Sequence, residues 1–306
     1  MIEHRQKRLR KNLTIRAQVI HAIRKFFIEH DYLEIETPVR IPAPAPEVHI
    51  SAVTSENWFL QTSPELCMKR MLASGYHRIF QICKCFRQGE RGRLHLPEMT
   101  LLEWYRADIN YQDMMNECEA LITAIACQTG SKDNLNYQGK KITLIPPWSR
   151  CSVDDAFKEY GSISALAAME QDRFDEIMIE QIEPNLGQTQ PVFLYDYPAA
   201  RGALARLKPQ DSRYAERFEL YIGGLEICNA FSELADPIEQ GERFKRENDQ
   251  RLKSGKPVYP TPQKFLAALE DMPAAAGNAL GIDRLVMLFS DSKQIDEVVA
   301  FTPEEL

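Results

Sequence analysis

Four segments of the chain carry side chains whose types and spacing could do chemistry. The first places Arg87 at the end of a predicted strand, followed by a loop that adds the cations Arg91 and Arg93. Arginine presents a planar fork of donors and stays charged, so an arginine that faces such a loop is suited to hold phosphate. Taken singly, each of these arginines is more often a surface cation.

Two carboxylates form a second candidate site. Glu219 and Glu226 stand on either side of Gly223-Gly224, a pair that predicts a tight hairpin turn. In such a hairpin the two carboxylates lie on adjacent strands and can face each other. Two carboxylates with a nucleotide between them are a usual magnesium site, although two strand glutamates taken alone are more often simply exposed.

The third and fourth segments suit an amine and a flat ligand. Asn229, Phe231 and Glu233 share one strand face, because alternate residues of a strand point to the same side. An amide, an aromatic ring and a carboxylate are poorly suited to an apolar core, but they would suit a pocket for an ammonium group on an apolar stem. The motif Gly277-x-Ala279-x-Gly281 lets a flat ligand or a backbone approach closely. Arg284, at the start of the helix that follows, could stack on a base or hold a phosphate.

The hydrophobic pattern predicts the elements that must position these segments. An apolar stripe predicts a helix over residues 15–29, and residues 78–87 and 99–105 predict an antiparallel hairpin with a long basic loop. Further expected elements are a strand at 33–36, a stiff proline-rich loop at 41–46, a helix opened by Pro64, a helix at 113–127, a hairpin at 137–144, a helical stretch at 174–182, strands at 192–197, 217–222 and 225–231, and a helix at 284–289. Antiparallel strands among helices predict an α+β fold rather than a parallel βαβ sheet.

The composition argues against several classes of protein. The 306 residues carry a formal net charge of −7, so the overall field does not favour a polyanion, although residues 5–16 and 84–93 are locally basic. Seven cysteines, without a CxxC pair or a histidine at zinc-ligand spacing, predict reduced core residues. No apolar run approaches the roughly 20 residues of a membrane span, and the N-terminus is basic, so we expect a cytoplasmic protein without a membrane partner.

The four segments, in this order, resemble the class II aminoacyl-tRNA synthetases. Ile35-Glu36-Thr37-Pro38 resembles motif 1, residues 86–106 resemble motif 2, and residues 277–285 resemble motif 3. The run GLEICNAFSELADP at 224–237 is similar to the lysine branch of that family, and the resemblance extends over residues 12–303. It implies one catalytic domain over residues 1–306, a mainly antiparallel sheet flanked by helices, and a homodimer formed through motif 1.

The resemblance also implies roles for the matching residues. Arg87 and Arg284 are the expected catalytic residues, with Arg87 on the α-phosphate and the substrate carboxylate. The residues expected to bind ATP are Arg87, Glu90, His95, Met99, Glu219, Glu226 and Arg284, of which Glu219 and Glu226 would hold Mg²⁺. The residues expected to bind the amino acid are Ser63, Glu65, Glu103, Tyr105, Asn229, Phe231, Glu233 and Ala279, with Glu65 on the amino group near the reacting end and Glu103, Tyr105 and Glu233 on the distal ammonium. The implied chemistry is attack of a carboxylate on ATP to give an aminoacyl-adenylate and pyrophosphate, followed by transfer to an acceptor, with the protein supplying position and charge.

Two differences from the lysyl-tRNA synthetases indicate which substrate and which acceptor to expect. The first predicted helix of the catalytic domain begins near residue 14, which leaves no room for the N-terminal OB-fold that reads the anticodon. Ser63 and Ala279 stand where the synthetases have alanine and glycine. Both features resemble the truncated paralogues that attach β-lysine to a lysine of elongation factor P. We therefore expect lysine or β-lysine as the substrate, elongation factor P as the acceptor, no tRNA and no anticodon-binding domain.

A third departure concerns ATP. The Arg-x-Glu of the family's motif 2 is spaced differently here, because Gly89 stands at the expected position and the acid is Glu90. In the family an aromatic residue stacks on the adenine, and Met99 stands at that position here. Methionine can still cover a base. Glu90 would reach the site if Gly89 bends the strand.

Two alternatives remain open. The chain could activate lysine for another carrier or for a minihelix-like RNA, because the motifs do not reveal the acceptor. It could also be a non-catalytic regulatory subunit. Such subunits usually lose the phosphate-binding arginines and the magnesium carboxylates, whereas Arg87, Arg284, Glu219 and Glu226 are all retained.

Overall fold

A long hairpin lies at the centre of the molecule. The computed structural model describes residues 5–202 and 204–306. In it, β5 (Arg78–Phe86) pairs antiparallel with β6 (Glu98–Ala107), from Arg78 opposite Arg106 to Phe86 opposite Glu98. The predicted hairpin and its basic loop are therefore confirmed, and the loop begins at Arg87.

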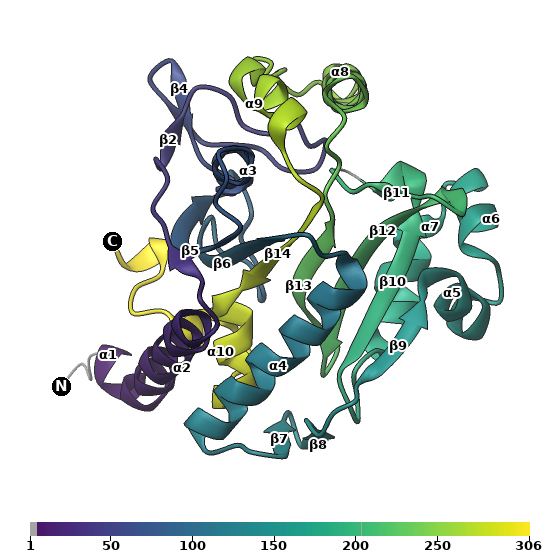
Figure 1. Cartoon of the computed structure of the whole chain (residues 1–306). Helices are drawn as coiled ribbons and strands as arrows, with labels where there is room; N and C mark the ends of the chain where they lie inside the picture. The colour runs from purple at the N-terminus through teal and green to yellow at the C-terminus, as the bar shows by residue number, and fades with distance from the viewer. Residues whose placement is uncertain (1–4, 203) are drawn as a thin grey trace.

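The hairpin belongs to one large sheet, which is drawn in Figure 1 with helices on both sides. Among the described residues this sheet has nine strands in the order β1-β5-β6-β14-β13-β12-β10-β9, with β11 paired to β12, and only the β1–β5 and β9–β10 pairs are parallel. The other strands of the sheet are β1 (Leu33–Glu34), β9 (Ser149–Ser152), β10 (Val192–Pro198), β11 (Leu207–Lys208), β12 (Asp211–Ile222), β13 (Leu225–Ser232) and β14 (Ala275–Gly281). The predicted α+β class is confirmed.

Smaller sheets and the helices complete the fold. The described chain also forms a sheet of β2 (Arg40–Ile41), β3 (Thr54–Ser55) and β4 (Trp58–Leu60), and a hairpin of β7 (Asn134–Tyr137) and β8 (Lys140–Thr143). The α-helices are α1 (Arg5–Arg8), α2 (Arg10–Glu29), α3 (Glu65–Ala73), α4 (Tyr111–Thr129), α5 (Val153–Gly161), α6 (Ala165–Glu170), α7 (Phe174–Ile177), α8 (Pro237–Lys253), α9 (Gln263–Ala268) and α10 (Ile282–Ser290). Among the described residues, no helix has both the length and the apolar character needed to cross a membrane.

Strand alternation divides the hairpin between two environments. Phe80 and Trp104 point into a core shared with α2, α4 and α10, whereas Ile79 and Tyr105 pack in a separate cluster with α3 and α9. Successive side chains of a strand point to opposite faces, so one face of β6 can fill the core while the other carries polar residues. Figure 1 shows α2, α4 and α10 grouped together and α3, α8 and α9 at the opposite end of the view.

Several predicted elements begin or end at other residues than the observed helices and strands. The stripe at 15–29 is confirmed by buried Val19, Ile23 and Phe27, but α2 already begins at Arg10. The strand expected at 33–36 is reduced to two exposed residues at the sheet edge, and the hairpin expected at 137–144 lies at 134–143. The helical stretch at 174–182 contains a single α-helical turn followed by a π-helical turn, Met178–Ile182.

Candidate active site

The polar face of the three central strands borders a cavity lined by Arg217, Glu219, Glu226 and Asn229, and this face and cavity are together called the cleft. In register, Glu103 of β6, Ala279 of β14 and Asn229 of β13 form one row across the sheet. Tyr105, Gly277 and Phe231 form the next row. The small residues of β14 therefore lie between the two flanking rows of larger side chains, as the predicted strand face requires.

Gly277 is needed because its neighbours leave no space for a side chain. A Cβ at this position would lie 2.3 Å from Cε1 of Tyr105 and 2.4 Å from Oε1 of Glu233. Carbon atoms essentially never approach so closely, so any larger residue would push the tyrosine or the carboxylate out of place. The glycine thus sets the position of two residues that we expect to bind the amino acid.

One end of the cleft is rich in buried carboxylates. Glu103 accepts hydrogen bonds from Ser63 Oγ at 2.6 Å and from Tyr105 Oη at 2.9 Å. Burial raises the pKa of Glu103 to about 7, and Glu65 adds to the effect. Burial likewise raises the pKa of Glu233 to about 8, against the attraction of Lys69. The structure therefore brings Ser63, Glu65, Glu103, Tyr105 and Glu233 together as predicted.

Lys69 is the cation of this acidic end. Its Nζ lies 2.5 Å from Oε1 of Glu65 and 2.5 Å from Oε2 of Glu233, and 5.1 Å from the ring centre of Phe231. The Nζ of Lys69 is close enough to Oε2 of Glu233 for a charge-assisted hydrogen bond, whereas Oε1 of Glu233 has no hydrogen-bond partner among the described residues. Glu233 therefore still has the capacity to accept donors from a bound molecule.

The other end of the cleft brings together residues suited to phosphate. Arg284 Nη1 donates to the backbone oxygen of Glu226 at 2.9 Å and to its Oε2 at 3.0 Å, and Nη2 donates to His95 Nε2 at 2.6 Å. Burial and the charge of Arg284 lower the pKa of His95, so the ring is neutral and can accept this hydrogen bond. Burial opposes ionisation of Glu226, but Arg284 outweighs it and the pKa of Glu226 is lowered.

Arg87 begins the loop between β5 and β6. Its backbone N–H donates to Pro97 O at 2.9 Å, and its Nη1 lies 3.7 Å from Oε2 of Glu90. Gly89 has a φ of +78°, which turns the chain so that Glu90 reaches back toward Arg87. The Nε of Arg87 is buried and has no hydrogen-bond partner among the described residues. The arginine therefore retains donors for a ligand.

Glu219 is tied into a hydrogen-bonded group that the sequence did not indicate. It accepts from Arg217 Nη2 at 2.5 Å, from Tyr197 Oη at 2.6 Å and from Tyr221 Oη at 2.7 Å. Burial raises its pKa, against the attraction of Arg217. Arg217 also donates from Nε to Asn229 Oδ1 at 2.9 Å. Arg217 thus connects the predicted magnesium carboxylate to the predicted amine pocket.

A loop lies along the cleft and adds Glu47. Glu47, Arg217, Glu219, Glu226 and Asn229 line one cavity of about 800 Å³. Arg251 of α8 is fully buried, and its Nη1 donates to Glu47 O and to Ile50 O, each at 2.7 Å. Burial raises the pKa of Glu47 to about 7, although Arg87 opposes the shift.

Sequence reasoning missed Lys69 and Glu47, and it noted Arg217 beside Glu219 without giving it a role. Lys69 follows Glu65 by four residues in a predicted helix, a spacing that pairs side chains and could have indicated it. Arg217 precedes Glu219 by two residues and so shares its strand face. Glu47 had no such signal, because its position depends on Arg251, some two hundred residues away.

Comparison with known proteins gave matches over nearly the whole chain. Residues 1–305 match the family model described as tRNA synthetases class II (D, K and N). The chain is 38% identical to the "Elongation factor P--(R)-beta-lysine ligase" of Vibrio atlanticus, over 95% of each chain. Proteins of the same name from Vibrio cholerae and Haemophilus influenzae are 39% and 38% identical, over 94% and 95% of this chain and 93% and 94% of theirs.

The acidic end of the cleft predicts an unusual dependence of stability on pH. Glu103 and Glu233 have pKa values of about 7 and about 8 in the folded protein, above their unfolded values. Between about pH 5 and pH 8 the folded state therefore holds protons that the unfolded state has lost, and raising the pH lowers the free energy of unfolding.

Urea unfolding of the ligand-free protein at a series of pH values measures this decrease in the free energy of unfolding. Glu233→Gln should flatten the curve between pH 5 and 8, because it removes a carboxyl group whose pKa is raised to about 8. Glu29→Gln, at a glutamate whose side chain is 59% exposed, is the control and should leave the curve unchanged. An identical pH curve for Glu233→Gln and the unmodified protein would contradict the assignment.

Proposed function

The chain belongs to the class II tRNA synthetase family, and on that basis we propose that it activates lysine or (R)-β-lysine with ATP and transfers the aminoacyl group to a lysine side chain of elongation factor P. The observation that most supports the proposal is the two-ended cleft. Buried carboxylates lie at one end, where Oε1 of Glu233 has no hydrogen-bond partner among the described residues, and Arg87, whose Nε has none either, lies at the other. A molecule that carries ammonium groups and is joined to a phosphate group matches both ends.

The proposed chemistry has two steps. In the first, a carboxylate oxygen of the amino acid attacks the α-phosphorus of ATP, and the bond to the bridging oxygen breaks to release pyrophosphate. Arg87 neutralises the α-phosphate and the carboxylate, and Arg284 with neutral His95 holds the outer phosphates or the adenine. In the second, an unprotonated lysine amine of the acceptor attacks the carbonyl carbon, an amide bond forms, AMP leaves and the amine proton passes to solvent. The protein acts mainly through position and charge.

The residues at the nucleotide end fit the magnesium ion that this chemistry implies. Glu226 is ionised next to Arg284, and its side chain is 38% exposed toward the cleft. In the part of the chain that the structure describes, no group of three or more His, Cys, Asp or Glu side chains could hold a metal ion. Magnesium commonly binds through one or two carboxylates plus substrate phosphates. We propose that Glu226 and Glu219 hold it in this way and that it neutralises phosphate charge.

The adenine contact remains a proposal that rests on Met99. Met99 lies on β6 opposite Cys85, three residues beyond Leu96, and is partly exposed. A flexible thioether can cover one face of a base without the ring that the family uses. We propose that Met99 and Arg284 together enclose the adenine.

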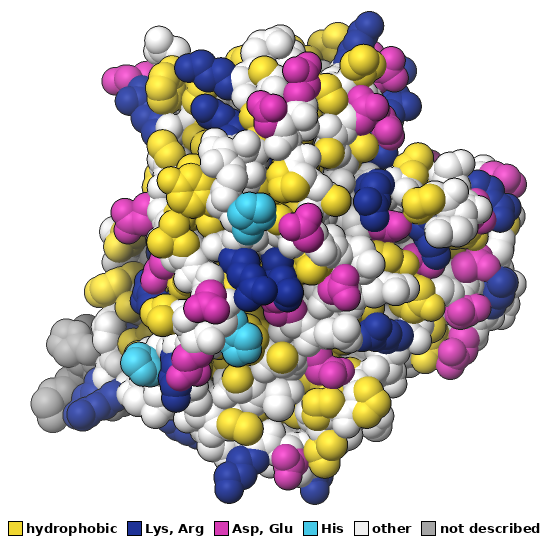
Figure 2. Space-filling view, viewed as in Figure 1, with side chains coloured by type: hydrophobic (Ala, Val, Ile, Leu, Met, Phe, Trp, Pro, Cys, Tyr) yellow, Lys and Arg dark blue, Asp and Glu magenta, His cyan; other side chains and the backbone are white. Residues whose placement is uncertain are grey.

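The acceptor is proposed to dock on the basic N-terminal helices. Arg5 and Arg16 are engaged within the molecule, by Glu305 at 2.9 Å and Asp283 at 2.6 Å. The other cations of this cluster are exposed, namely Lys7, Arg8, Arg10 and Lys11. Elsewhere, on the face that Figure 2 draws, the described cationic and anionic side chains are interspersed. That distribution suits a small acidic protein surface better than the long phosphate backbone of a tRNA.

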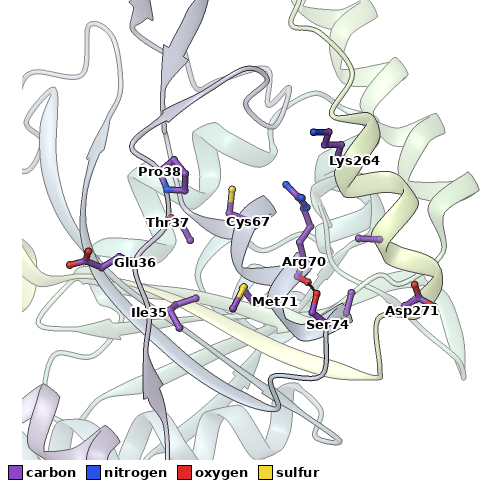
Figure 3. Close-up of a pocket in the computed structure, with 12 residues that line it drawn as sticks. Ile35, Glu36, Thr37, Pro38, Cys67, Arg70, Met71, Ser74, Lys264 and Asp271 are labelled. Carbon is purple, nitrogen blue, oxygen red and sulfur yellow. Dashed lines mark hydrogen bonds between the residues drawn. The ribbon is translucent and has the colours of Figure 1, made fainter.

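A homodimer formed through the motif 1 segment is also part of the proposal. Residues 35–38 border a cavity of about 450 Å³ whose opposite walls come from α3 and α9, as Figure 3 shows. Ile35 still donates its N–H to Phe80 O of β5 at 2.9 Å, but residues 36–38 belong to no described strand. Glu36 and Pro38 are exposed, so their surface is available to a second copy.

The direct test is the intact mass of elongation factor P after incubation with the protein, ATP, magnesium and either α-lysine or (R)-β-lysine. We expect a gain of one lysyl unit, larger with the β-isomer, and no charging of lysine tRNA run in parallel. Charging of the tRNA with an unmodified factor would contradict the proposed acceptor. The absence of lysine-dependent pyrophosphate exchange would contradict the proposed activation.

The choice between the lysine isomers is proposed to depend on Ser63 and Ala279. Ser63 donates to Glu103, and Ala279 lies between Glu103 and Asn229 in the sheet, so both shape the amine pocket. Ser63→Ala combined with Ala279→Gly should shift the ratio of kcat/KM toward α-lysine by about tenfold, close to the contribution of one hydrogen bond. Pyrophosphate exchange with each isomer measures the ratio. Ser74→Ala, at the residue that follows α3 and borders the other cavity, is the control, and an unchanged ratio in the double variant would refute the assignment.

A further inference from the structure

A fully buried lysine already occupies the acidic end of the cleft. Lys69 lies on α3, one helical turn after Glu65, and its side chain has no exposed surface. Its ammonium contacts Glu65 and Glu233, at 2.5 Å each, and lies within 6.0 Å of the ring centres of Phe231 and Phe265. The residues around this ammonium therefore include three that we expect to bind the amino acid.

The stability of the fold does not account for this ion pair. Removing two charges from water costs several kcal/mol per ion, and the mutual attraction of a buried pair often only offsets that cost. Apolar side chains of similar volume would hold α3 on the sheet at least as well, as Leu66, Met68 and Leu72 do in the neighbouring cluster. A role in the cleft explains the lysine better than a role in packing.

A count of charges indicates what that role is. Glu65, Glu103 and Glu233 lie at this end, and among the described residues Lys69 is the cation in ion-pair contact with two of them, Glu65 and Glu233. When all three carboxyl groups are ionised, which is the state that substrate binding would favour, they and the one ammonium carry a net charge of −2. A diamino acid brings two ammonium groups, which would balance this charge, while its carboxylate is held at the arginine end. Without Lys69 the balance would fail by one charge, and burial would favour protonation of a carboxylate.

We propose that Lys69 is a positioning residue that sets the charge of the pocket: it holds the carboxyl groups of Glu65 and Glu233 in place and favours their ionised form when a substrate with two ammonium groups binds at Glu103 and Glu233. The proposal deepens the proposed function and rests on it. Lys69 does not contact the reacting atoms. It acts through the two carboxylates, and so it determines binding of the diamino acid rather than the rate of the chemical step.

The next residue of α3 provides a matched control. Figure 3 shows Arg70, with Cys67, Met71 and Ser74, lining the cavity beside residues 35–38 rather than the acidic end of the cleft. Arg70 is exposed, whereas Lys69 is buried. Lys69→Met removes a cation inside the cleft. Arg70→Met removes a cation of similar length from the same turn of the same helix, but outside the cleft.

The test measures lysine-dependent pyrophosphate exchange for Lys69→Met, Lys69→Arg and Arg70→Met across pH 6 to 9. For Lys69→Met we expect KM for the amino acid to rise at least about 30-fold while kcat changes less than about threefold, the pattern of lost substrate binding. The acid limb of kcat/KM should move to higher pH by about one unit, because the carboxylates lose a neighbouring positive charge. For Lys69→Arg the acid limb of kcat/KM should stay at the pH of the unmodified protein. Arg70→Met should match that protein both in KM for the amino acid and in the pH of the acid limb.

Binding of magnesium-ATP, at the other end of the cleft, reports whether each variant is folded. A Lys69→Met protein that binds ATP normally, with unchanged KM and pH limb, overturns the proposal and leaves the proposed function standing. If Lys69→Met and Lys69→Gln both fail to fold while Lys69→Arg folds, Lys69 is a structural ion pair and the proposal is also overturned. If the unmodified protein shows no lysine-dependent exchange, the proposed function itself fails, and the assignment of Lys69 fails with it.

Discussion

The cleft encloses more carboxyl groups than the protein's own cations can neutralise. Glu103 and Glu233 are almost fully buried, at 1% and 3% exposure, and Lys69 is the one cation in direct ion-pair contact with the group among the described residues. Such an arrangement is unfavourable in the free protein, which is why the carboxyl groups titrate near neutral pH rather than near pH 4. It becomes favourable when a ligand brings its own ammonium groups. The free site therefore lacks positive charge, and a diamino substrate supplies it.

The rest of the structure serves to hold that charge in place. The register of β6, β14 and β13 sets Glu103 and Asn229 on either side of Ala279, and Gly277 leaves space for Tyr105 and Glu233. The opposite faces of these strands bury Trp104 and Leu280 in the core with α2, α4 and α10. A change of register by one residue would move the carboxylates into that core, so the apolar core also fixes the geometry of the polar site.

Much of this arrangement follows from patterns that are local in the sequence. The strand period places Asn229, Phe231 and Glu233 on one face, and the small residues of β14 indicate a close approach, because each pattern involves neighbours in one strand. The family resemblance then related these strands to one another. Lys69 and Glu47 could not be placed in this way. Whether a helical lysine points to solvent or to Glu233 depends on how α3 docks, and the position of Glu47 depends on hydrogen bonds from Arg251 in a distant helix.

The central claim is that binding of the diamino acid drives ionisation of the buried carboxyl groups. The most direct measurement is calorimetric titration of the protein with (R)-β-lysine, in the presence of a non-hydrolysable ATP analogue, at pH 7 in buffers of different ionisation enthalpy. Because the carboxyl groups of Glu103 and Glu233 have pKa values of about 7 and about 8 in the free protein, binding should release on the order of one proton to the buffer. Tight binding with no proton released would show that the pocket was already ionised, and it would contradict the electrostatic account of this site.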